Sequence, residues 1–377
     1  MFNPAQRLQN IRKSATRVLY DSAPPGSINL GLGEPDFATP EVVRREAIRV
    51  IQEGHISYTA NAGILPLREK IAEYHCEGLS SPFTPAAVCV TTGAEEAIFA
   101  VMMTVLGPGD EALLPDPGYI AYPAIAEIAG ADLRYYATPA ASGFAFDRES
   151  FDRAVTDKTK LVIINSPSNP TSRVISRDDL RFIAGRLSRS SAYVLADEIY
   201  RDLYYTAERP ASISTFHKRT IVLSGLSKSM SMTGWRLGWM CGEEAVIRSA
   251  LILHGYVTTC ASTVSQKAAL AAWTPEGEKA RADIRKTFHE RRDCLLSLIS
   301  RELGLRAVAP DGAFYTMVDT SSYGLSMEVA EKLLNHGVIT IPGAAFGDQS
   351  EGFLRVSFCA DNDKLAEGVR RIKGALT

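Results

Sequence analysis

The chain has 377 residues and a formal net charge of −2, because its 41 lysines and arginines nearly balance its 43 aspartates and glutamates. Hydrophobic residues make up 46% of the chain and charged residues 22%, so we expect a folded protein with a sizeable core and not a disordered one. The balanced charge gives no sign of a nucleic-acid-binding surface or of a polybasic membrane patch.

The cysteines, histidines and N-terminal residues indicate the compartment. The six cysteines and six histidines form no C-x-x-C, H-x-x-H or H-E-x-x-H pair, so we expect free thiols in a reducing compartment and no metal site. Residues 1–19, MFNPAQRLQNIRKSATRVL, lack the apolar core of a signal peptide. The longest apolar run, 97–106, has about half the length of a membrane span. The sequence therefore predicts a soluble, cytoplasmic protein.

Short apolar runs alternate with amphipathic stretches between about residues 45 and 280. The runs are rich in β-branched residues and end abruptly in polar ones, so they are predicted strands: 88–91, 161–165, 193–196 and 221–223. Two of the stretches between them, 94–106 and 178–189, are predicted helices. This alternation is typical of α/β proteins and favours a mostly parallel, doubly wound sheet.

The C-terminal part has a different pattern. A long amphipathic helix is predicted at 275–303, after the breaker Thr274-Pro275, and two strands, 314–320 and 352–358, flank a helix at 327–335. This order favours a smaller α+β domain, on which we expect the N-terminal segment to pack. The predicted division is an N-terminal segment, a large domain and a small domain, at residues 1–44, 45–280 and 281–377.

Polar residues stand where the predicted strands end, which is where parallel α/β sheets bind ligands. Thr92-Gly93-Ala94-Glu95 follows strand 88–91 and opens a helix, whose first N–H groups suit a phosphate. Asn169 follows strand 161–165 in the stretch SPSNPTS, and its amide could bond a ligand oxygen. An ordinary strand–helix turn and an ordinary Asn-Pro turn would explain both stretches without a ligand.

Asp197 directly follows strand 193–196, and Tyr200 comes three residues later. A carboxylate at the end of a buried strand is costly unless a partner compensates its charge. Two interpretations remain open from the residues alone. Asp197 is either the N-cap of a helix or the anionic partner of a protonated ring nitrogen.

The stretch SGLSKSMSMTGWRLGWM, residues 224–240, contains two cations, Lys228 and Arg236, and no acid. A lysine can form a Schiff base with a carbonyl, and an arginine can bind phosphate oxygens in a bidentate manner. Ser227 could add a hydroxyl. A lone lysine is usually a surface residue, but Lys228 comes after a predicted strand, as Asn169 and Asp197 do. Together these residues suit a cofactor with a phosphate, an aldehyde, a phenolic oxygen and a basic ring nitrogen, which pyridoxal 5′-phosphate (PLP) has.

Nine blocks of the sequence, in order and spread over nearly the whole chain, resemble the fold-type I PLP-dependent aminotransferases of class I/II, the aspartate-aminotransferase-like family. The resemblance implies an enzyme that moves an amino group from an L-amino acid to a 2-oxo acid by a ping-pong mechanism, with aspartate or another small donor favoured. The blocks are NLGLGEPDFATP (29–40), SYTANAGILPLREKIAEY (57–74), TTGAEEAI (91–98), PDPGYIAYP (115–123), SPSNPTS (166–172), ADEIY (196–200), SKSMSMTGWRLGW (227–239), IPGAAFG (341–347) and FLRVSF (353–358).

The resemblance also implies roles for the matching residues. Lys228 resembles the Schiff-base lysine that moves the substrate α-proton, and Asp197 resembles the aspartate that keeps the pyridine nitrogen protonated. Tyr58 resembles a tyrosine that reaches the phosphate in the neighbouring subunit, which implies a homodimer with shared sites. The other residues implied to bind the cofactor are Gly93, Ala94, Glu95, Tyr119, Asn169, Tyr200, Ser227 and Arg236. The residues implied to bind the substrate are Gly33, Asn169 and Arg355.

Three positions depart from the family's pattern. Gly225 stands where many members have serine or threonine, so a phosphate contact is either missing or supplied by Ser224 or Ser227. Ser172 stands where N-P-T is usually followed by glycine, so the turn must form without one. Glu95 lies beside the expected phosphate, and we expect its side chain to point away.

Alternative functions remain open from the sequence. A carbon–sulfur β-lyase or a decarboxylase would use the same cofactor residues. A PLP-sensing regulator would carry a DNA-binding module first, and we expect none because the block NLGLGEPD already begins at residue 29. A dicarboxylate substrate would need a second arginine or lysine that faces the pocket. Arg17, the residues near Thr16, and Tyr256 are candidate pocket residues by analogy.

Overall fold

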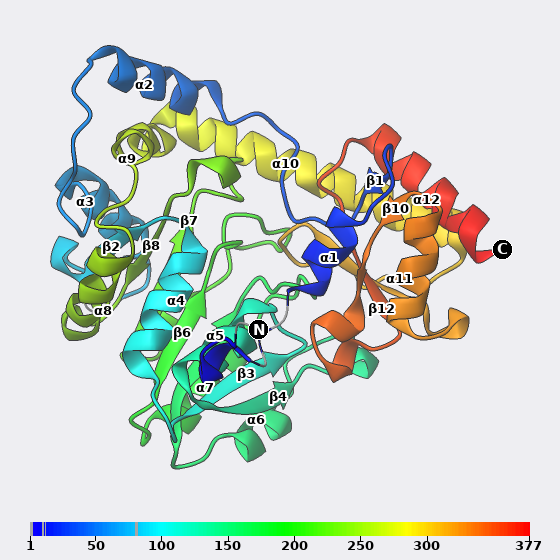
Figure 1. The fold of residues 1–377 in the computed structure, drawn as a ribbon, viewed down its shortest axis with the longest axis horizontal. Coiled ribbons are helices and arrows are strands. Elements are labelled where there is room, and N and C mark those ends of the chain that lie inside the picture. The colour runs from blue at the N-terminus through cyan, green and yellow to red at the C-terminus, as the bar shows by residue number, and fades with distance from the viewer. Residues whose placement is uncertain (1–2, 10, 12, 80–81) are drawn as a thin grey trace.

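A seven-stranded sheet forms the centre of the computed structural model, which describes residues 3–9, 11, 13–79 and 82–377 (Figure 1). The strand order is β2-β8-β7-β6-β5-β3-β4, and every neighbouring pair is parallel except the two pairs that contain β8. The mostly parallel sheet is confirmed. The strands are β2 (Val88–Thr91), β3 (Glu111–Asp116), β4 (Asp132–Ala137), β5 (Thr159–Asn165), β6 (Tyr193–Asp197), β7 (Thr220–Gly225) and β8 (Gly238–Cys241).

Helices cover both faces of this sheet, and each face has its own apolar cluster. In β5, Val162 and Ile164 pack into one cluster while Leu161 and Ile163 pack into the other, which explains why the strand is apolar throughout. One face is covered by α4 (Ala94–Val105), α5 (Ala121–Ala129) and α8 (Glu244–Val257). The other is covered by α2 (Glu41–Gln52), α3 (Leu65–Tyr74), α6 (Arg148–Ala154), α7 (Arg177–Leu187) and α9 (Thr263–Ala269).

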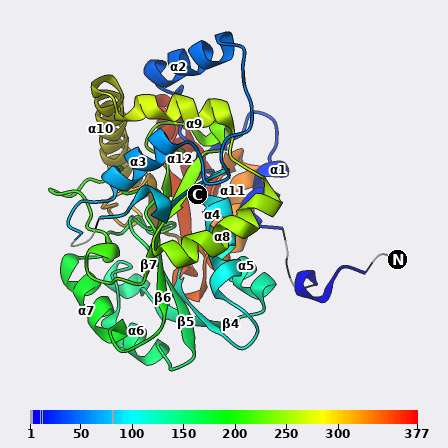
Figure 2. The ribbon, with the colours of Figure 1, turned by 90° about the vertical axis from the view of Figure 1, so that its left-hand side faces the viewer.

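The C-terminal part forms a smaller α+β unit around a third apolar cluster, as predicted. Its antiparallel sheet has the order β11-β12-β9, and the N-terminal strand β1 pairs with β10, so the N-terminal segment packs on this unit. Seen from the side, α2, α9 and the start of α10 lie together at one end of the molecule (Figure 2). The elements are α1 (Ala15–Asp21), β1 (Ile28–Asn29), α10 (Pro275–Leu298), β9 (Tyr315–Asp319), α11 (Ser326–Asn335), β10 (Val338–Ile339), β11 (Ile341–Pro342), β12 (Phe353–Ser357) and α12 (Asn362–Leu376).

The predicted elements agree closely with the observed ones. The strand at 88–91 coincides with β2, and the long helix begins at Pro275 with Thr274 as its N-cap, whose Oγ1 accepts from the Gly277 N–H at 3.2 Å. This helix continues as one π-helical turn to Leu303. The predicted division of the chain at residues 44 and 280 stays a prediction. Among the described residues, no helix is both long enough and apolar enough to cross a membrane.

Two glycines allow close backbone approaches at the sheet, and one of them, Gly238, brings the start of α4 against it. Gly225 and Gly238 face each other across β7 and β8. A Cβ at Gly238 would lie 2.5 Å from the backbone of Gly93 and Ala94, and a Cβ at Gly225 would lie 2.9 Å from the carbonyl oxygen of Leu237. The glycine at position 225 therefore has a packing reason, because a serine or threonine there would collide with the neighbouring strand.

We predict that Gly238→Ala lowers the free energy of unfolding by about 1–3 kcal/mol, because backbone atoms cannot move aside as a flexible side chain can. Gly185→Ala is the matched control. Gly185 lies in α7 with open space where its Cβ would be, so this variant should gain about 0.5–1 kcal/mol from helix propensity. Urea unfolding of both variants checks the prediction, and equal stabilities would contradict it.

Candidate functional site

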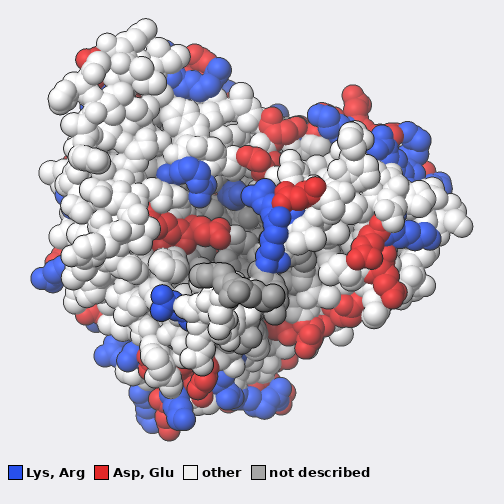
Figure 3. Space-filling model, viewed as in Figure 1, with Lys and Arg blue, Asp and Glu red and all other residues white. Residues whose placement is uncertain are grey.

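A cavity of about 630 Å³ lies at the carboxyl ends of β5, β6 and β7. Figure 3 shows this face of the molecule hollowed, with cationic and anionic side chains bordering the hollow. The cavity is lined by all the predicted site residues except Gly93 and Tyr58, namely Gly33, Ala94, Glu95, Tyr119, Asn169, Asp197, Tyr200, Ser227, Lys228, Arg236 and Arg355. Chain segments far apart in the sequence therefore contribute to one site.

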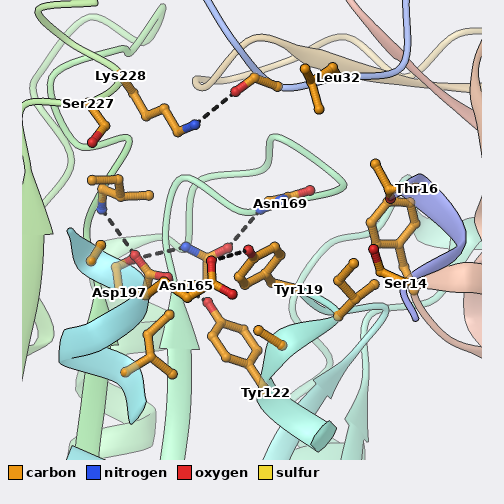
Figure 4. Close-up of a pocket in the computed structure, with 18 of the residues that line it drawn as sticks. Ser14, Thr16, Leu32, Tyr119, Tyr122, Asn165, Asn169, Asp197, Ser227 and Lys228 are labelled. Atoms are coloured by element: carbon orange, nitrogen blue, oxygen red, sulfur yellow. Dashed lines mark hydrogen bonds between the residues drawn. The ribbon is translucent and has the colours of Figure 1, made fainter. Parts of the chain in front are cut away.

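Lys228 follows β7 and points across the cavity toward the segment that contains Leu32 (Figure 4). Its Nζ donates a hydrogen bond to the carbonyl oxygen of Gly33 at 2.8 Å. Burial lowers the pKa of the Lys228 amine, because the charged form loses its hydration. A lysine that deprotonates readily can act as a nucleophile and as a base.

Asp197 is the last residue of β6, and its side chain is almost completely buried, since the residue is 4% exposed. Its carboxylate accepts hydrogen bonds from the Tyr122 hydroxyl at 2.7 Å and from the Ile199 N–H at 3.1 Å, and it forms no ion pair with any described residue. Burial raises the pKa of this carboxyl to about 6. No helix begins after Asp197, so the N-cap interpretation is wrong.

Two residues that contact Asp197 were not predicted from the sequence. Tyr122 lies three residues after Tyr119 and donates to Asp197. Asn165 ends β5, donates to the backbone oxygen of Asp197 at 3.0 Å, and accepts from the Asn169 N–H at 2.7 Å. The rule that ligands bind at strand ends would have found Asn165. The contact between Tyr122 and Asp197 joins residues 75 positions apart, and no local pattern indicates it.

The start of α4 and Arg236 together form a place for an anion. Gly93 is the N-cap of α4 with a φ of 106°, and a Cβ there would lie 2.6 Å from Nη2 of Arg236. The guanidinium therefore lies directly beside the first N–H groups of the helix, where the helix dipole also favours negative charge. Ser227 lines the cavity, whereas Ser224 donates to the carbonyl oxygen of Glu198 at 3.1 Å. Of the two serines, Ser227 is the one available to a ligand.

Arg355 lies in β12 and is 3% exposed. Its Nη1 donates to Oδ1 of Asn169 at 2.7 Å, and its Nη2 donates to the carbonyl oxygen of Gly31 at 2.5 Å. Its Nε has no hydrogen-bond partner among the described residues. A buried guanidinium bound only to neutral acceptors suits a carboxylate, which bonds to arginine more strongly than a carbonyl does.

Glu95 lies differently from what was expected, and Tyr58, like Gly93, does not line the cavity. The Glu95 side chain does not point away from the site: it lines the cavity and accepts a hydrogen bond from the Tyr119 hydroxyl at 2.9 Å. Tyr58 is 85% exposed on the surface. In the part of the chain that the structure describes, no group of three or more histidine, cysteine, aspartate or glutamate side chains is arranged to hold a metal ion.

Comparisons with known proteins agree with this geometry. Residues 25–372 match the family described as aminotransferase class I and II. The putative aminotransferase YugH of Bacillus subtilis is 37% identical over 97% of this chain and 96% of its own length. The probable aspartate aminotransferase of Methanocaldococcus jannaschii is 33% identical over 98% of both chains.

A solved structure extends the likeness to the fold. The aspartate aminotransferase from Thermus thermophilus, solved with maleate, superposes with a TM-score of 0.93 at 33% identity, covering 100% of both chains. The match of the family over nearly the whole sequence and the match of the fold point to the same conclusion. The chain belongs to the class I and II aminotransferase family.

Proposed function

We propose that the protein is a PLP-dependent aminotransferase that moves an amino group from an L-amino acid to a 2-oxo acid in two half-reactions. The observation that carries the proposal is a buried carboxylate, Asp197, that forms no ion pair with the described residues and lies in the same cavity as a lysine with a lowered pKa, Lys228. A protonated ring nitrogen would supply the missing cation for Asp197. When bound, PLP supplies an electron sink for the charge left on the substrate α-carbon.

The remaining groups of PLP also find suitable residues. Its aldehyde would bond to Lys228, and its phosphate would lie between Arg236 and the start of α4. Tyr119 would stack on the ring, and Tyr200 and Asn169 would bond its phenolic oxygen. Each of these side chains lines the one cavity, which supports PLP over a cofactor that lacks any of the four groups.

The chain's own residues would perform the chemistry as follows. Lys228 takes the α-proton of the substrate and returns it on a different carbon, and its lowered pKa favours the neutral amine that this step needs. Gly33 accepts a hydrogen bond from this amine and so fixes its direction. Arg355 orients the α-carboxylate by two parallel hydrogen bonds.

We further propose that the favoured donor carries a second carboxylate, as aspartate does, and that Arg17 binds it. Arg17 lines the cavity, and its guanidinium forms no ion pair or hydrogen bond with other described residues. The nearby Asp21 carboxylate is already paired with Lys13 at 2.5 Å. In Figure 4, Ser14 and Thr16 beside Arg17 lie across the cavity from Asp197. The Thermus relative was solved with maleate, a dicarboxylate, which supports this choice.

A homodimer is the proposed assembly. Residues 56–61 and 252–257 lie side by side, because the His254 ring forms a hydrogen bond with the carbonyl oxygen of Asn61 at 3.0 Å. Both segments expose apolar side chains on the surface. The exposed members are Ile56, Tyr58, Ile252, Tyr256 and Val257. A second copy of this chain would cover them and would bring Tyr58 to the phosphate of the partner's cavity. The cytoplasmic location stays a prediction.

Lys228→Ala tests the proposed activity. The wild-type protein should turn yellow with PLP, lose the colour with aspartate and regain it with a 2-oxo acid. The variant should not show this loss and return of colour. Its turnover should fall by about 10³-fold or more, because it has no base for the proton transfer. Visible spectra with donor and acceptor added separately measure both effects. Release of ammonia or carbon dioxide without any return of the colour would favour a lyase or a decarboxylase.

Asp197→Asn should change the pH dependence of stability of the cofactor-free protein. The folded carboxyl has a pKa of about 6, above the value near 4 of the unfolded chain, so the wild type loses stability as the pH rises from about 4 to about 6. The asparagine carries no charge. At pH 8 the variant should therefore be more stable than the wild type by about 3 kcal/mol, and near pH 4 the two should be equal.

Urea unfolding at several pH values measures this difference, and PLP provides the control. Added PLP should stabilise the wild type more than the variant, because only the aspartate carries the charge that holds a protonated ring nitrogen. A stability difference that stays constant between pH 4 and pH 8 would contradict the prediction.

Arg17→Gln should change the choice of donor. We expect the ratio of kcat/KM for aspartate to that for alanine to fall about 10–100-fold, because one charge-assisted interaction is lost for aspartate only. Initial rates with both donors measure this ratio. Lys13→Gln, on the same segment but paired with Asp21, is the control and should leave the ratio within about 2-fold. An unchanged ratio in Arg17→Gln would rule out Arg17 as the specificity residue.

A further inference from the structure

Tyr315 is a buried residue of the cavity wall to which the sequence analysis assigned no role. It is the first residue of β9, is 2% exposed, and lines the cavity. Its hydroxyl lies 3.0 Å from the hydroxyl of Tyr200. The guanidinium of Arg355 lies over its ring, with Cζ 4.2 Å from the ring centre. One side chain thus touches both the phenol expected beside the cofactor and the arginine expected to bind the substrate.

The Tyr315 hydroxyl also occupies the space that a side chain at Gly33 would take. A Cβ on Gly33 would lie 1.7 Å from Oη of Tyr315, and no other contact of that Cβ would be as close. Gly33 in turn accepts the hydrogen bond from Lys228 through its carbonyl oxygen. The absence of a side chain at position 33 therefore makes room for the hydroxyl and lets this backbone approach Lys228.

The backbone of Tyr315 is held by one of the residues that depart from the family's pattern. Its N–H donates to Oγ of Ser172 at 3.3 Å. Ser172 has a φ of 57°, the left-handed conformation that favours glycine, and its backbone oxygen accepts from the N–H groups of Asp311 and Gly312. The serine hydroxyl thus provides a contact that a glycine could not, and it ties Tyr315 to the turn that follows Asn169.

The direction of the Tyr200–Tyr315 hydrogen bond follows from the role of Tyr200. If Tyr200 donates its proton to the phenolic oxygen of PLP, its own oxygen must accept, so Tyr315 is the donor to Tyr200. A hydroxyl that accepts a hydrogen bond becomes a stronger donor itself. The other charged or titratable groups that act on the Tyr200–Tyr315 pair are Tyr119, Asp197, Arg355 and Cys359.

We propose that Tyr315 is a positioning residue that links the two halves of the reaction site. Its hydroxyl orients and strengthens Tyr200 toward the cofactor, and its ring holds the Arg355 guanidinium in place for the substrate carboxylate. This inference rests on the proposed function, because the roles of Tyr200 and Arg355 belong to that proposal.

Two substitutions separate the hydroxyl from the ring. Tyr315→Phe removes the hydroxyl and keeps the ring under Arg355. In the PLP-loaded protein, the pH midpoint of the visible absorbance should rise by about 0.5 unit or more, because weaker donation to the phenolic oxygen lets the cofactor hold its proton more tightly. Tyr200→Phe should shift the midpoint in the same direction. The KM for aspartate should change less than about 3-fold in Tyr315→Phe.

Tyr315→Leu removes the ring as well. It should raise the KM for aspartate about 10-fold more than Tyr315→Phe does, because the contact between the guanidinium and the ring is lost. A third comparison uses Gly33→Ala, which should cost less activity in the Tyr315→Phe background than in the wild type, because the hydroxyl that collides with the new Cβ is gone.

The controls distinguish failure of this inference from failure of the proposed function. Tyr136→Phe removes a buried hydroxyl that bonds the carbonyl oxygen of Ile163, and it should shift neither the midpoint nor the KM. Urea unfolding of every variant identifies any that is not folded. If wild-type protein with PLP shows no visible band, the proposed function fails. If the wild type titrates normally and Tyr315→Phe has the same midpoint, the inference alone is overturned.

Discussion

The buried carboxylate of Asp197 is the constraint on which the rest of the cavity depends. It receives hydrogen bonds from Tyr122 and Ile199 but no ion pair from the described residues, and a buried charge without a counter-ion is costly. The sheet and the helix α5 supply enough apolar contact to hold it there. A cationic group of a ligand at this position would pair with the carboxylate and remove this cost. Binding of such a ligand would therefore raise the free energy of unfolding.

The sheet determines which polar groups meet. Asn165 and Asp197 are partners in the register of β5 and β6, and Asp197 is the partner of Leu223 in β7, five residues before Lys228. Adjacent strands are about 4.8 Å apart, so residues at the carboxyl ends of three neighbouring strands fall within about 10 Å of one another. The spacing of the polar groups across the site is thus a consequence of parallel pairing. Only the identity of the side chains at the strand ends is particular to this site.

This regularity also explains what could be predicted from the sequence. Lys228, Asp197 and Asn169 could be found because each follows an apolar run that predicts a strand. Tyr315 could not, because its partner Tyr200 lies 115 residues away, in the turn that follows β6, and a tyrosine in an apolar run usually indicates core packing. The strand β8 was missed for a related reason. It has only four residues and pairs antiparallel with β2, which lies far away in the sequence, so no local pattern indicated it.

The site joins two units of the fold, and three of the hydrogen bonds that cross between them involve proposed site residues on both sides or the neighbouring Tyr315. Tyr200 meets Tyr315 at 3.0 Å, Asn169 meets Arg355 at 2.7 Å, and Lys228 meets Gly33 at 2.8 Å. In each pair the residue from the large α/β part belongs to the proposed cofactor site, and its partner is either a proposed substrate-binding residue, Arg355 or Gly33, or the proposed positioning residue Tyr315. In the proposed reaction, a substrate carboxylate would compete with Asn169 and the Gly31 carbonyl for Arg355, and as a charged acceptor it would form the stronger bond. Its binding would then release the Asn169 amide, which is a proposed ligand of the cofactor.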